Sequence, residues 1–553
     1  MIENLEKKII AYSLKNALEH EGKCLQGNVI NALFHEGLKK EEIKDISKLI
    51  NEKVNFVNSM RLDEQKKEFD QLKELISKRE TRGENELPKI PNVIPGKIVT
   101  RIPPEPSKYN HIGHAISFLF NYSYAKEYNG KCILRFEDTN PEKVSQEYVD
   151  AMKKDVLEYL DIKPDEIRYV SDDMEKLYSY AEQLINTDNA YVCFCEQEKL
   201  RELRHKGKEC EHRNQTKKEN MDYWKEMLNG KYKEGEVSLR LKGDMKSLNQ
   251  VMRDPVIFRI VETPHYKLGN RYKVWPMYDF YNPIEDGLCK VTHILRSNEF
   301  EQRIELQDRI KDLLNLPKQT ITQYGRFQVL DAVTQGREIR ELIESGKYIG
   351  WDDPRLVTLR ALRRRGIVKE TYYELLKHIG ISKKSATLDF NMIASINRKI
   401  IDQIANRYSC VFNPIRLKIK NSPKINEIKV KIHPLKEEER TIKVNNEIYI
   451  SKEDFDTSKG KEVRLMNLYN IRIINEKEAE FMDDNQKNIP KINWVSEGIN
   501  VKIMMPNAEV IEGFAEKAVE KLKVNDLIQF ERFGFLRVDE INDNKIVFWF
   551  SHK

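Results

Sequence analysis

The sequence predicts a multidomain protein in which a helical N-terminal segment precedes an α/β region, and an all-β region ends the chain. Three observations support this prediction. The chain has 553 residues, and domains usually hold roughly 100 to 200 residues, so several compact units are expected. The order strand, loop, helix, strand between residues 97 and 136 favours a right-handed βαβ unit with a parallel sheet. After about residue 410, short apolar strands replace the helical periodicity.

The composition favours a globular protein with an ionic surface and a polyanionic partner. Charged residues make up 33% of the chain, and 95 Lys and Arg against 89 Asp and Glu give a net charge of +6. Seven cysteines in so long a chain do not resemble a disulfide framework and fit a reducing compartment. There is no signal-peptide pattern and no uncharged run of the roughly 20 residues that a membrane helix needs. We therefore expect a cytoplasmic protein with no membrane partner.

Four segments follow from periodicity and from breaker residues. Residues 1–95 show helical spacing of apolar residues such as Ile9 and Leu14, and end in a proline-rich linker. Residues 96–330 carry the α/β pattern, interrupted at about 194–265 by a polar, Lys-rich insertion. Residues 331–395 are predicted to be helical, and residues 396–553 to be β-rich.

Two β-hairpins are predicted in the last segment. Residues 441–444 and 447–450 flank Asn445-Asn446, a pair that favours a tight turn. Residues 527–538 and 545–550 flank the turn residues Asn542, Asp543 and Asn544.

The tetrapeptide His111-Ile112-Gly113-His114 lies where a Pro-rich loop meets a helix. Free backbone N–H groups at a helix N-terminus favour phosphate, and Gly113 leaves room for a nucleotide. When a carboxylate attacks the α-phosphate of ATP, negative charge grows on the phosphorus and on the leaving pyrophosphate, and two histidines could donate to it. The alternative interpretation is an ordinary helix N-terminus. The preceding strand and following helix favour the nucleotide site, at a sheet edge shared with Arg101 and Glu105.

Five segments resemble the class I glutamyl- and glutaminyl-tRNA synthetases, and the archaeal type of glutamyl enzyme fits best. They are TRIPPEPSKYNHIGHA, LRFEDTNPEK, WPMYDFYNPIEDGLCKVTHILRSNE, GWDDPRLVTLRALRRRGI and QFERFGFLRVDE, and they extend the similarity over about residues 97–553. The resemblance implies a Rossmann-type catalytic domain with an inserted domain that binds the acceptor end of tRNA. A helical linking domain and two C-terminal β-barrels that bind the anticodon are expected to follow.

The resemblance also implies a reaction and its residues. Glutamate and ATP, with Mg²⁺ on the phosphates, would give glutamyl-adenylate, and the glutamyl group would pass to tRNA(Glu). Such an enzyme is expected to be monomeric, to need bound tRNA for adenylate formation, and to charge tRNA(Gln) as well. The implied catalytic residues are His111 and His114, and the implied ATP-binding residues are Pro104, Glu105, Ile112 and Gly113. The implied glutamate-binding residues are Arg101, Glu137, Tyr278 and Arg296.

Arg296 bears on the choice between glutamate and glutamine. The distal carboxylate of glutamate accepts hydrogen bonds only, whereas the amide of glutamine also presents donors. An arginine facing this group should reject glutamine, because each opposed donor costs about 1 to 3 kcal/mol. A glutaminyl-tRNA synthetase is the nearest alternative. Without the resemblance, Arg296 could equally be a surface ion-pair partner and Tyr278 a core aromatic residue.

The sequence departs from the family in the second signature loop, which resembles K-M-S-K-S in related enzymes. Here the loop reads VLDAVTQGREIRELI, and no lysine lies between Lys318 and Lys347. Arg337 or Arg340 is the nearest cation in the sequence that could neutralise phosphate, and we assign the catalytic role to Arg337. The alternative is a loop that has lost its role in a tRNA-binding paralogue without catalysis.

Two further groups of residues are candidates for binding. Cys193, Cys195, Cys210 and His212 form two close pairs separated by a 14-residue polar loop, which suits one structural Zn²⁺, and the alternative is incidental thiol and imidazole groups. The basic segment beside Trp351-Asp352-Asp353-Pro354 matches the linking segment of the family and is predicted to contact the tRNA backbone. Its residues are Arg360, Arg363, Arg364 and Arg365. Charge runs are otherwise usually solvated faces, as the Lys-rich stretch 204–218 could be.

Overall fold

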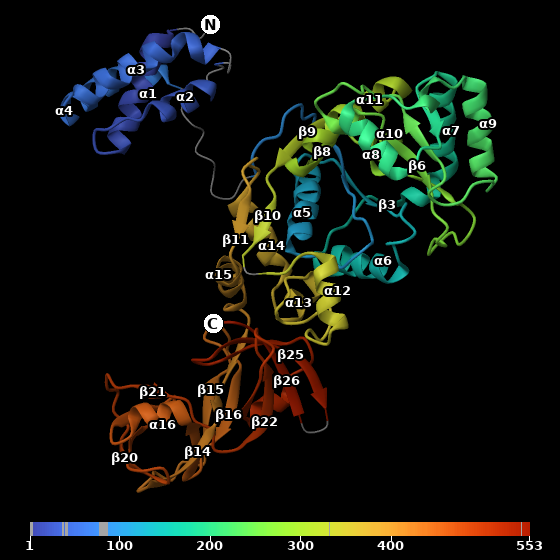
Figure 1. Ribbon diagram of the computed structural model, residues 1–553. Helices are drawn as coiled ribbons and strands as arrows, with labels where there is room; N and C mark the ends of the chain where they lie inside the picture. The colour runs from blue at the N-terminus through green and yellow to red at the C-terminus, as the bar shows by residue number, and fades with distance from the viewer. Residues whose placement is uncertain (1–3, 36–37, 39–41, 77–86, 331, 543–544) are drawn as a thin grey trace. The chain divides into compact units, whose positions relative to one another are not determined.

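The structure is a computed structural model, and it describes residues 4–35, 38, 42–76, 87–330, 332–542 and 545–553. The chain divides into two compact units, Met1–Glu86 and Leu87–Lys553 (Figure 1). The predicted combination of N-terminal helices, an α/β region and a C-terminal β-rich region is confirmed. No helix in the described part of the chain combines the length and apolar character needed to cross a bilayer.

The N-terminal unit is helical, as the apolar spacing predicts. Ile9 and Leu14 are fully buried in a core shared by all four helices, together with Val29 and Ile50. The amphipathic helices therefore pack against one another through their apolar faces. The elements are α1 (Leu5–Glu19), α2 (Gln26–His35), α3 (Ile43–Ser59), α4 (Leu62–Leu72) and the short η2 (Lys73–Leu75).

The second unit begins with a parallel sheet. Strands β1 (Val99–Ile102), β2 (Lys131–Phe136) and β3 (Glu166–Tyr169) pair in parallel, as do β8 (His293–Ser297) and β9 (Thr320–Tyr324). The two groups adjoin, because the Thr292 N–H donates to the Val99 carbonyl. Helix α5 (Ile112–Glu127) connects β1 to β2, so the predicted βαβ unit is confirmed. This is the Rossmann-type arrangement, in which ligands bind beyond the carboxyl ends of the strands.

Helix α5 is buried on most of its surface. It packs on β1, β2 and β8 and against α14, and Ile116, Leu119 and Phe120 are all fully buried. Gly130 follows the helix and lets β2 start close to the chain before β1, since a Cβ on Gly130 would lie 2.3 Å from the Ile98 carbonyl oxygen. This packing fixes the N-terminus of α5 beyond the carboxyl end of β1.

An antiparallel sheet is formed by β4 (Ala190–Cys193), β5 (Ser238–Leu241), β6 (Val256–Ile260) and β7 (Val274–Pro276), and β5 and β6 lie within the predicted insertion. It has its own apolar core around Trp224, Phe258 and Trp275. Helix α6 (Gln146–Lys153) and η3 (Lys154–Tyr159) pack instead in the core of the parallel sheet. The helices that follow them are η4 (Val170–Asp173), α7 (Met174–Asn186), α8 (Gln197–Lys206), η5 (Glu211–Asn214), α9 (Lys217–Leu228), η6 (Gln250–Met252), α10 (Tyr278–Leu288), η7 (Asn298–Arg303) and α11 (Ile304–Leu314).

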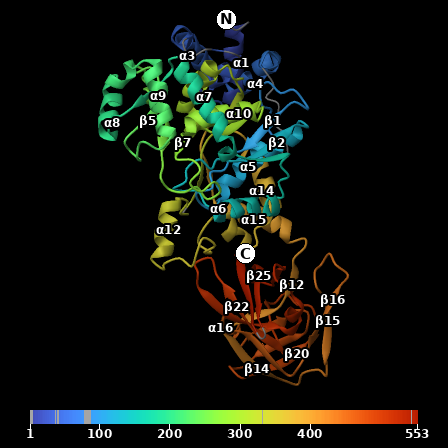
Figure 2. The same ribbon diagram turned by 90° about the vertical axis from the view of Figure 1, so that its right-hand side faces the viewer.

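Short helices connect this region to the C-terminal strands. Strand β10 (Phe327–Val329) pairs in parallel with β11 (Ala386–Leu388), so the intervening helices leave the sheet and return to it. These helices are α12 (Gly336–Glu344), α13 (Leu359–Arg364) and α14 (Lys369–Ile379), and α15 (Phe390–Ile401) follows. Figure 2 shows α12 standing apart from α14 and α15.

Besides a two-stranded sheet of β15 (Glu427–Lys431) and β16 (Glu439–Lys443), the C-terminal region contains two large sheets with separate cores. One has the order β12 (Asn406–Tyr408), β24 (Leu527–Phe530), β25 (Gly534–Asn542), β26 (Lys545–His552), β22 (Gly498–Met504), β23 (Val510–Glu516) and β13 (Cys410–Phe412). The other has the order β17 (Glu447–Ser451), β14 (Pro414–Lys420), β20 (Glu478–Asp483), β19 (Asn470–Ile473), β18 (Glu462–Leu465) and β21 (Lys491–Ile492). Two short helices, α16 (Lys452–Ser458) and η8 (Lys517–Lys521), accompany them.

One predicted hairpin is wrong and the other is confirmed. Residues 441–444 and 447–450 do not pair, because β16 (Glu439–Lys443) pairs with β15 (Glu427–Lys431) and β17 pairs with β14. The pairing of β17 with β14 buries Ile448 and Ile450 beside Leu417, and this burial outweighs the local turn preference of the two asparagines. Strands β25 and β26 form the last hairpin; Asn542 ends β25, and the predicted turn residues Asp543 and Asn544 lie outside the described residues.

A charged contact joins α13 to the last hairpin. Arg364 donates to both carboxylate oxygens of Asp539 at 2.9 and 2.7 Å and to Asp352 at 2.9 Å. Its guanidinium also lies 4.1 Å from the ring centroid of Trp549. A bidentate fork on a mostly buried carboxylate is stronger than a surface ion pair.

We therefore expect Arg364→Met to destabilise the second unit by about 1–3 kcal/mol, because Asp539 loses its bidentate partner in a largely buried setting. Lys369→Met is the matched control, since Lys369 pairs with Asp161 where both side chains are more exposed, and it should cost about 0–1 kcal/mol. Urea unfolding followed by tryptophan fluorescence measures both. Equal midpoints for the two variants would contradict the assignment of this contact as a structural one.

Candidate active site

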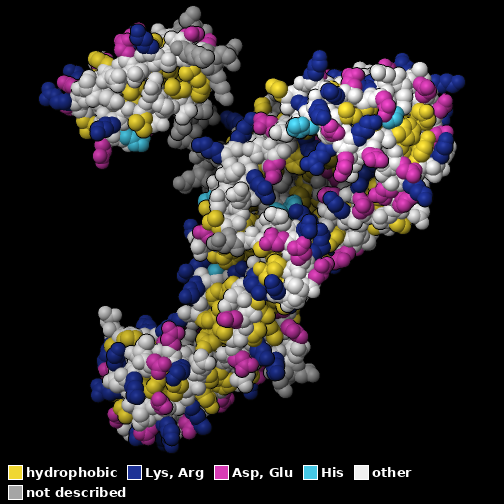
Figure 3. Space-filling model, in the orientation of Figure 1, with side chains coloured by type: hydrophobic (Ala, Val, Ile, Leu, Met, Phe, Trp, Pro, Cys, Tyr) yellow, Lys and Arg dark blue, Asp and Glu magenta, His cyan; other side chains and the backbone are white. Residues whose placement is uncertain are grey.

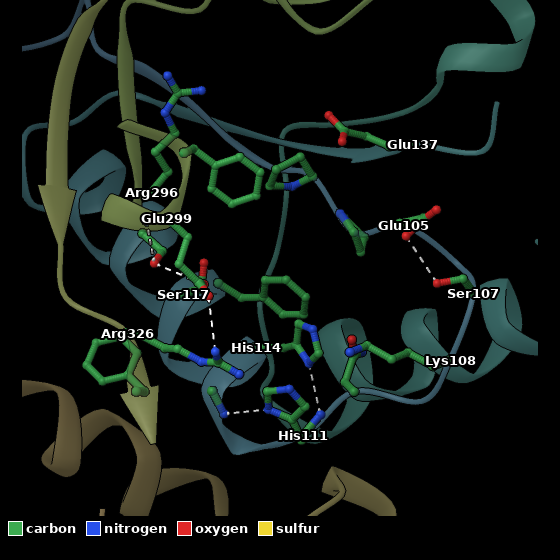
Figure 4. Close-up of a pocket in the computed structure, with 18 of the residues that line it drawn as sticks. Glu105, Ser107, Lys108, His111, His114, Ser117, Glu137, Arg296, Glu299 and Arg326 are labelled. Carbon is green, nitrogen blue, oxygen red and sulfur yellow. Dashed lines mark hydrogen bonds and ion pairs between the residues drawn. The ribbon is translucent and has the colours of Figure 1, made fainter. Parts of the chain in front are cut away.

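A cavity of about 620 Å³ lies beyond the carboxyl ends of β1, β2 and β8, at the N-terminus of α5. Nine predicted site residues line it, namely Arg101, Pro104, Glu105, His111, Gly113, His114, Glu137, Tyr278 and Arg296. Figure 4 shows the two histidines at one end and Arg296 at the other. The structure thus brings together residues from four separate parts of the sequence.

The two histidines are held by the backbone that begins α5. The Gly113 N–H donates to His111 Nδ1, and the His111 N–H donates to His114 Nδ1, both at 3.1 Å. The ring centroids are 3.9 Å apart. Because each Nδ1 accepts a hydrogen bond, the proton of each neutral ring must reside on Nε2. Each histidine therefore has one N–H donor left for a ligand.

Burial keeps both histidines neutral. It lowers the pKa of His111 to about 3, with a smaller contribution from the positive charges of Lys108 and Arg326. Burial also lowers the pKa of His114 well below its ordinary value, again helped by His111 and Lys108. In the neutral state Nδ1 accepts the backbone N–H and Nε2–H remains a donor, so the hydrogen bonds that orient both rings are kept.

The structure refines the prediction for the residues between the histidines. Gly113 is needed because a Cβ at this position would lie 2.9 Å from Cε1 of the His111 ring. Ile112 does not line the cavity, and its part in binding ATP stays a prediction. Its side chain is fully buried in the core, and its N–H already donates to the Val357 carbonyl at 3.2 Å.

A buried charge network forms the wall next to Glu137. Asp286 accepts from Arg101 at 3.0 Å and from Arg135 at 2.8 Å, and Arg135 also donates to Glu137 at 3.1 Å. Burial alone would raise the pKa of Asp286, but the two guanidiniums outweigh it and lower the pKa. For Glu137 burial prevails and raises the pKa, despite Arg135 and Arg101. Asn282 donates to the same carboxylate at 2.9 Å.

Arg296 differs from these arginines because it lacks a carboxylate partner. Its Nη1 donates to Gln307 Oε1 at 2.8 Å, whereas its Nε and Nη2 are buried without a hydrogen-bond partner. Arg296 forms no ion pair among the described residues, although it lines the cavity beside Tyr278. Buried donors without partners cost free energy, and a ligand that accepts from them recovers it.

The cation predicted for the second signature loop is not in the cavity. Arg337 begins α12 with 89% of its side chain exposed and pairs with Glu341 at 3.0 Å. In this structure α12 directs Arg337 to solvent and away from the cavity, and its catalytic role stays a prediction. Lys108 and Arg326 line the cavity beside the histidines instead. Lys108 lies three residues before His111 in the sequence, and this proximity was the one signal that could have found it.

Cys193, Cys195, Cys210 and His212 lie together in the inserted region, with one ligand atom of each within 4.8 Å of the others. Sγ of Cys193 is 3.8 Å from Sγ of Cys210 and 3.8 Å from Nδ1 of His212, and Sγ of Cys195 is 3.4 Å from the same nitrogen. In a tetrahedral zinc site with bonds of about 2.3 Å, ligand atoms are about 3.8 Å apart. The donor set and its spacing fit this ion.

The four arginines of the linking segment divide into two pairs. Arg360 and Arg363 are exposed and lie over the rings of Tyr109 and Tyr159. Arg365 is buried and donates to the carbonyls of Pro354 and Ser551, while Arg364 holds Asp539. The guanidinium of Arg365 is thus used inside the protein and that of Arg364 is largely occupied, and tRNA contact stays a prediction for these arginines. On the face shown in Figure 3, basic and acidic side chains are interspersed over the C-terminal strands.

Comparison with known proteins agrees with this geometry. Residues 97–403 match the family described as tRNA synthetases class I (E and Q), catalytic domain. Residues 405–491 and 483–539 match two families described as anti-codon binding domains of the same synthetases. The fold and the cavity therefore define a class I tRNA synthetase of the E and Q group.

Similar proteins extend over the whole chain. The glutamate–tRNA ligases of Pyrococcus abyssi and Pyrococcus horikoshii are each 39% identical, and that of Pyrococcus furiosus is 38% identical. Each alignment covers 99% or 100% of this chain and 100% of the relative. The chain belongs to the archaeal-type glutamate–tRNA ligase family, and the resemblance predicted from the sequence is confirmed.

The neutral state of His111 predicts how stability depends on pH. The pKa of a histidine in an unfolded chain is about 6.5, and it is about 3 in the folded protein. Between these values only the unfolded state binds the proton, so the contribution of His111 to stability is complete above pH 6.5 and is lost as the pH falls towards 3.

Denaturant unfolding of the ligand-free protein at pH 7.5 and pH 5 should therefore show a larger loss of stability for the wild type than for His111→Asn, which has no titrating ring. Nitrogen chemical shifts of labelled histidine should report Nε2–H for His111 across this range. A His111 titration midpoint near 6.5 would contradict the buried, neutral assignment.

Proposed function

We propose that this chain attaches L-glutamate to tRNA(Glu) through glutamyl-adenylate, with ATP as the second substrate. The observation that carries the proposal is Arg296, which lines one end of the cavity with two buried donors that have no hydrogen-bond partner, while the other end presents the Nε2–H groups of His111 and His114. The guanidinium at the Arg296 end suits a carboxylate, and the N–H donors at the histidine end suit phosphate. The names of the full-length relatives agree with this reading.

The reacting groups follow from this arrangement. The glutamate distal carboxylate would accept from Arg296, and the buried carboxylate of Glu137 would hold the α-amino group. The α-carboxylate would then lie towards ATP, and an oxygen of it attacks the α-phosphorus while pyrophosphate leaves. The histidine Nε2–H groups would donate to the charge that develops on the phosphate oxygens. Mg²⁺, when bound on the phosphates, neutralises part of that charge.

Arg296 should also set the choice of amino acid. Its Nε and Nη2 can only donate, so the distal amide of glutamine would place its NH₂ against at least one of them. An unsatisfied buried donor costs about 1–3 kcal/mol, and two would give on the order of a hundredfold discrimination or more. The glutaminyl alternative requires a site with an acceptor at this position.

Exchange of pyrophosphate into ATP tests the proposed function. The full chain with tRNA(Glu) should catalyse exchange with glutamate and not with glutamine, and omission of tRNA should abolish it. Arg296→Gln should lower kcat/KM for glutamate by about a hundredfold and leave the trace activity with glutamine unchanged or higher.

Arg303→Gln is the matched control for this substitution, because Arg303 also lines the cavity but already pairs with Asp279. We expect it to reduce activity with both amino acids equally. A preference of the wild type for glutamine would contradict the assignment of glutamate as the substrate. Absence of exchange with either amino acid, despite tRNA binding, would favour a tRNA-binding paralogue without catalysis, the alternative that the loop without lysine supports.

The partners and location extend the same proposal. We propose that Arg360 and Arg363 contact the tRNA backbone, since both are exposed beside the cavity lined by Tyr109 and Asp155. Charging of tRNA(Gln), a monomeric state and a cytoplasmic location belong to the proposal as the sequence predicts them. Acylation assays with tRNA(Gln) and sedimentation of the full chain measure the first two.

We also propose that Cys193, Cys195, Cys210 and His212 hold one structural Zn²⁺. Arg240 Nη1 lies 3.7 Å from Sγ of Cys193 and 3.5 Å from Sγ of Cys210, so a guanidinium would offset part of the negative charge of the thiolates. Bound zinc would cross-link β4 to the polar loop that ends at His212.

Protein purified without chelator should therefore contain about one equivalent of zinc, and Cys210→Ser should lower it below about half an equivalent. Cys24→Ser is the matched control, because Cys24 is equally buried but lies in the N-terminal unit, and its zinc content should stay unchanged. Less than half an equivalent in the wild type would count against the site.

A further inference from the structure

The cavity contains a cation that the second signature loop does not provide. We propose that Lys108 binds the β- and γ-phosphates of ATP and stabilises the departing pyrophosphate, in place of the lysine that this loop lacks. The proposal rests on the proposed function, since it assigns a further catalytic residue to the same reaction. Four observations support it.

The first observation is that Lys108 is an uncompensated charge. It lines the cavity half-buried and forms no salt bridge among the described residues. Burial lowers the pKa of Lys108, and Arg326 and Arg340 lower it further, with only Glu105 acting in the opposite direction. A partly buried ammonium without a partner is destabilising in the empty protein, and a bound anion relieves that cost.

The second observation is the place of Lys108 beside the histidines. Figure 4 shows Lys108 next to His114 and His111, at the end of the cavity away from Arg296. Its charge is close enough to contribute to the lowered pKa of both rings. The ammonium and the two Nε2–H donors therefore bound the same part of the cavity, where the phosphates of ATP would lie in the proposed reaction.

The third observation links Lys108 to the altered loop. The aliphatic part of Lys108 passes over Gly336, so that a Cβ on Gly336 would lie 3.1 Å from Cδ and 3.4 Å from Cβ of the lysine. The absence of a side chain at Gly336 therefore leaves room for the aliphatic part of Lys108.

The fourth observation concerns the other cations nearby. Arg337 is exposed and paired with Glu341. Arg326 lines the cavity, but it pairs with Glu299 at 3.3 Å. Arg340 donates to the Ser107 carbonyl at 3.4 Å and does not line the cavity. Lys108 is therefore the cation whose charge remains available for phosphate among the described residues around the histidines.

The chemistry distinguishes the two half-reactions. In the first, a bond forms between the glutamate α-carboxylate oxygen and the α-phosphorus, and the bond to the bridging oxygen breaks, so that pyrophosphate leaves with the electron pair. Lys108 remains protonated and transfers no proton. In the second, the tRNA hydroxyl attacks the adenylate and AMP leaves, with no pyrophosphate present. Lys108 should therefore matter in the first step and not in the second.

The test uses the full chain and the variants Lys108→Met and Lys108→Arg. Lys108→Met should lower kcat for tRNA-dependent pyrophosphate exchange by about a hundredfold, the usual effect of removing one preorganised stabilising group. Lys108→Arg, which keeps the charge, should recover most of it. Transfer of glutamate from preformed adenylate to tRNA should stay within about threefold of the wild type. Lys97→Met, which changes an exposed lysine before β1, is the matched control and should be unaffected.

Equilibrium binding keeps this proposal separate from the proposed function. Lys108→Met should weaken binding of ATP by at least about tenfold while leaving adenosine within about twofold, and this comparison needs no catalysis and detects a misfolded variant as loss of both ligands. Equal affinity of wild type and Lys108→Met for ATP would overturn the role of Lys108. So would full exchange activity in Lys108→Met with loss in Arg337→Gln, even where the wild type charges tRNA with glutamate.

Discussion

The part of the cavity wall that contains Arg101 and Glu137 is held together by one carboxylate. Asp286, on α10, is shared by Arg101 of β1 and Arg135 of β2, and it is fully buried. Two guanidiniums around one carboxylate would leave a net positive charge in the core, and Glu137 next to Arg135 offsets it. Three elements are thereby tied at their ends. Removing one member of this network would leave a buried charge unpaired, which is strongly destabilising. The ion pairs are formed within the protein, so these side chains are held in place before a substrate binds.

The histidine end of the cavity is fixed by hydrogen bonds that join the loop before α5 to the linking segment. The Leu359 N–H donates to the Asn110 carbonyl, and the Ile112 N–H donates to the Val357 carbonyl. His111 and Thr358 thereby form an isolated antiparallel β-bridge. The side chain of Asn110 also donates to the buried Asp155 at 3.0 Å. The histidines are thus placed by residues almost 250 positions later in the chain. Helix α13 begins at Leu359, and Arg364 at its end donates to Asp539 of the last hairpin. The loop that carries His111 and the last hairpin therefore both contact α13.

The parts of the structure that were predictable from the sequence are those set by local pattern. The βαβ unit and the histidine pair at the start of α5 depend on neighbouring residues, and both were predicted. The pairing of β17 with β14 was not, because burial of Ile448 and Ile450 decides it across 30 residues of chain. Spacing alone also did not show that Arg337 points to solvent or that Arg365 is buried. Whether an arginine faces a cavity, solvent or a carbonyl depends on the direction of a helix, which the count of residues from a motif does not give.

The charges of the site separate into two kinds, and the separation indicates which groups meet substrate. Arg101, Arg135 and Asp286 form ion pairs with one another, and Arg135 also pairs with Glu137, so these arginines mainly define the shape of the site. Arg296 and Lys108 have no carboxylate partner among the described residues, and they lie at opposite ends of one cavity. Leaving a half-buried cation unpaired costs stability, which a fold tolerates where a bound anion repays it. Two such cations, separated by the length of the cavity, match a substrate pair that carries a carboxylate at one end and a chain of phosphates at the other.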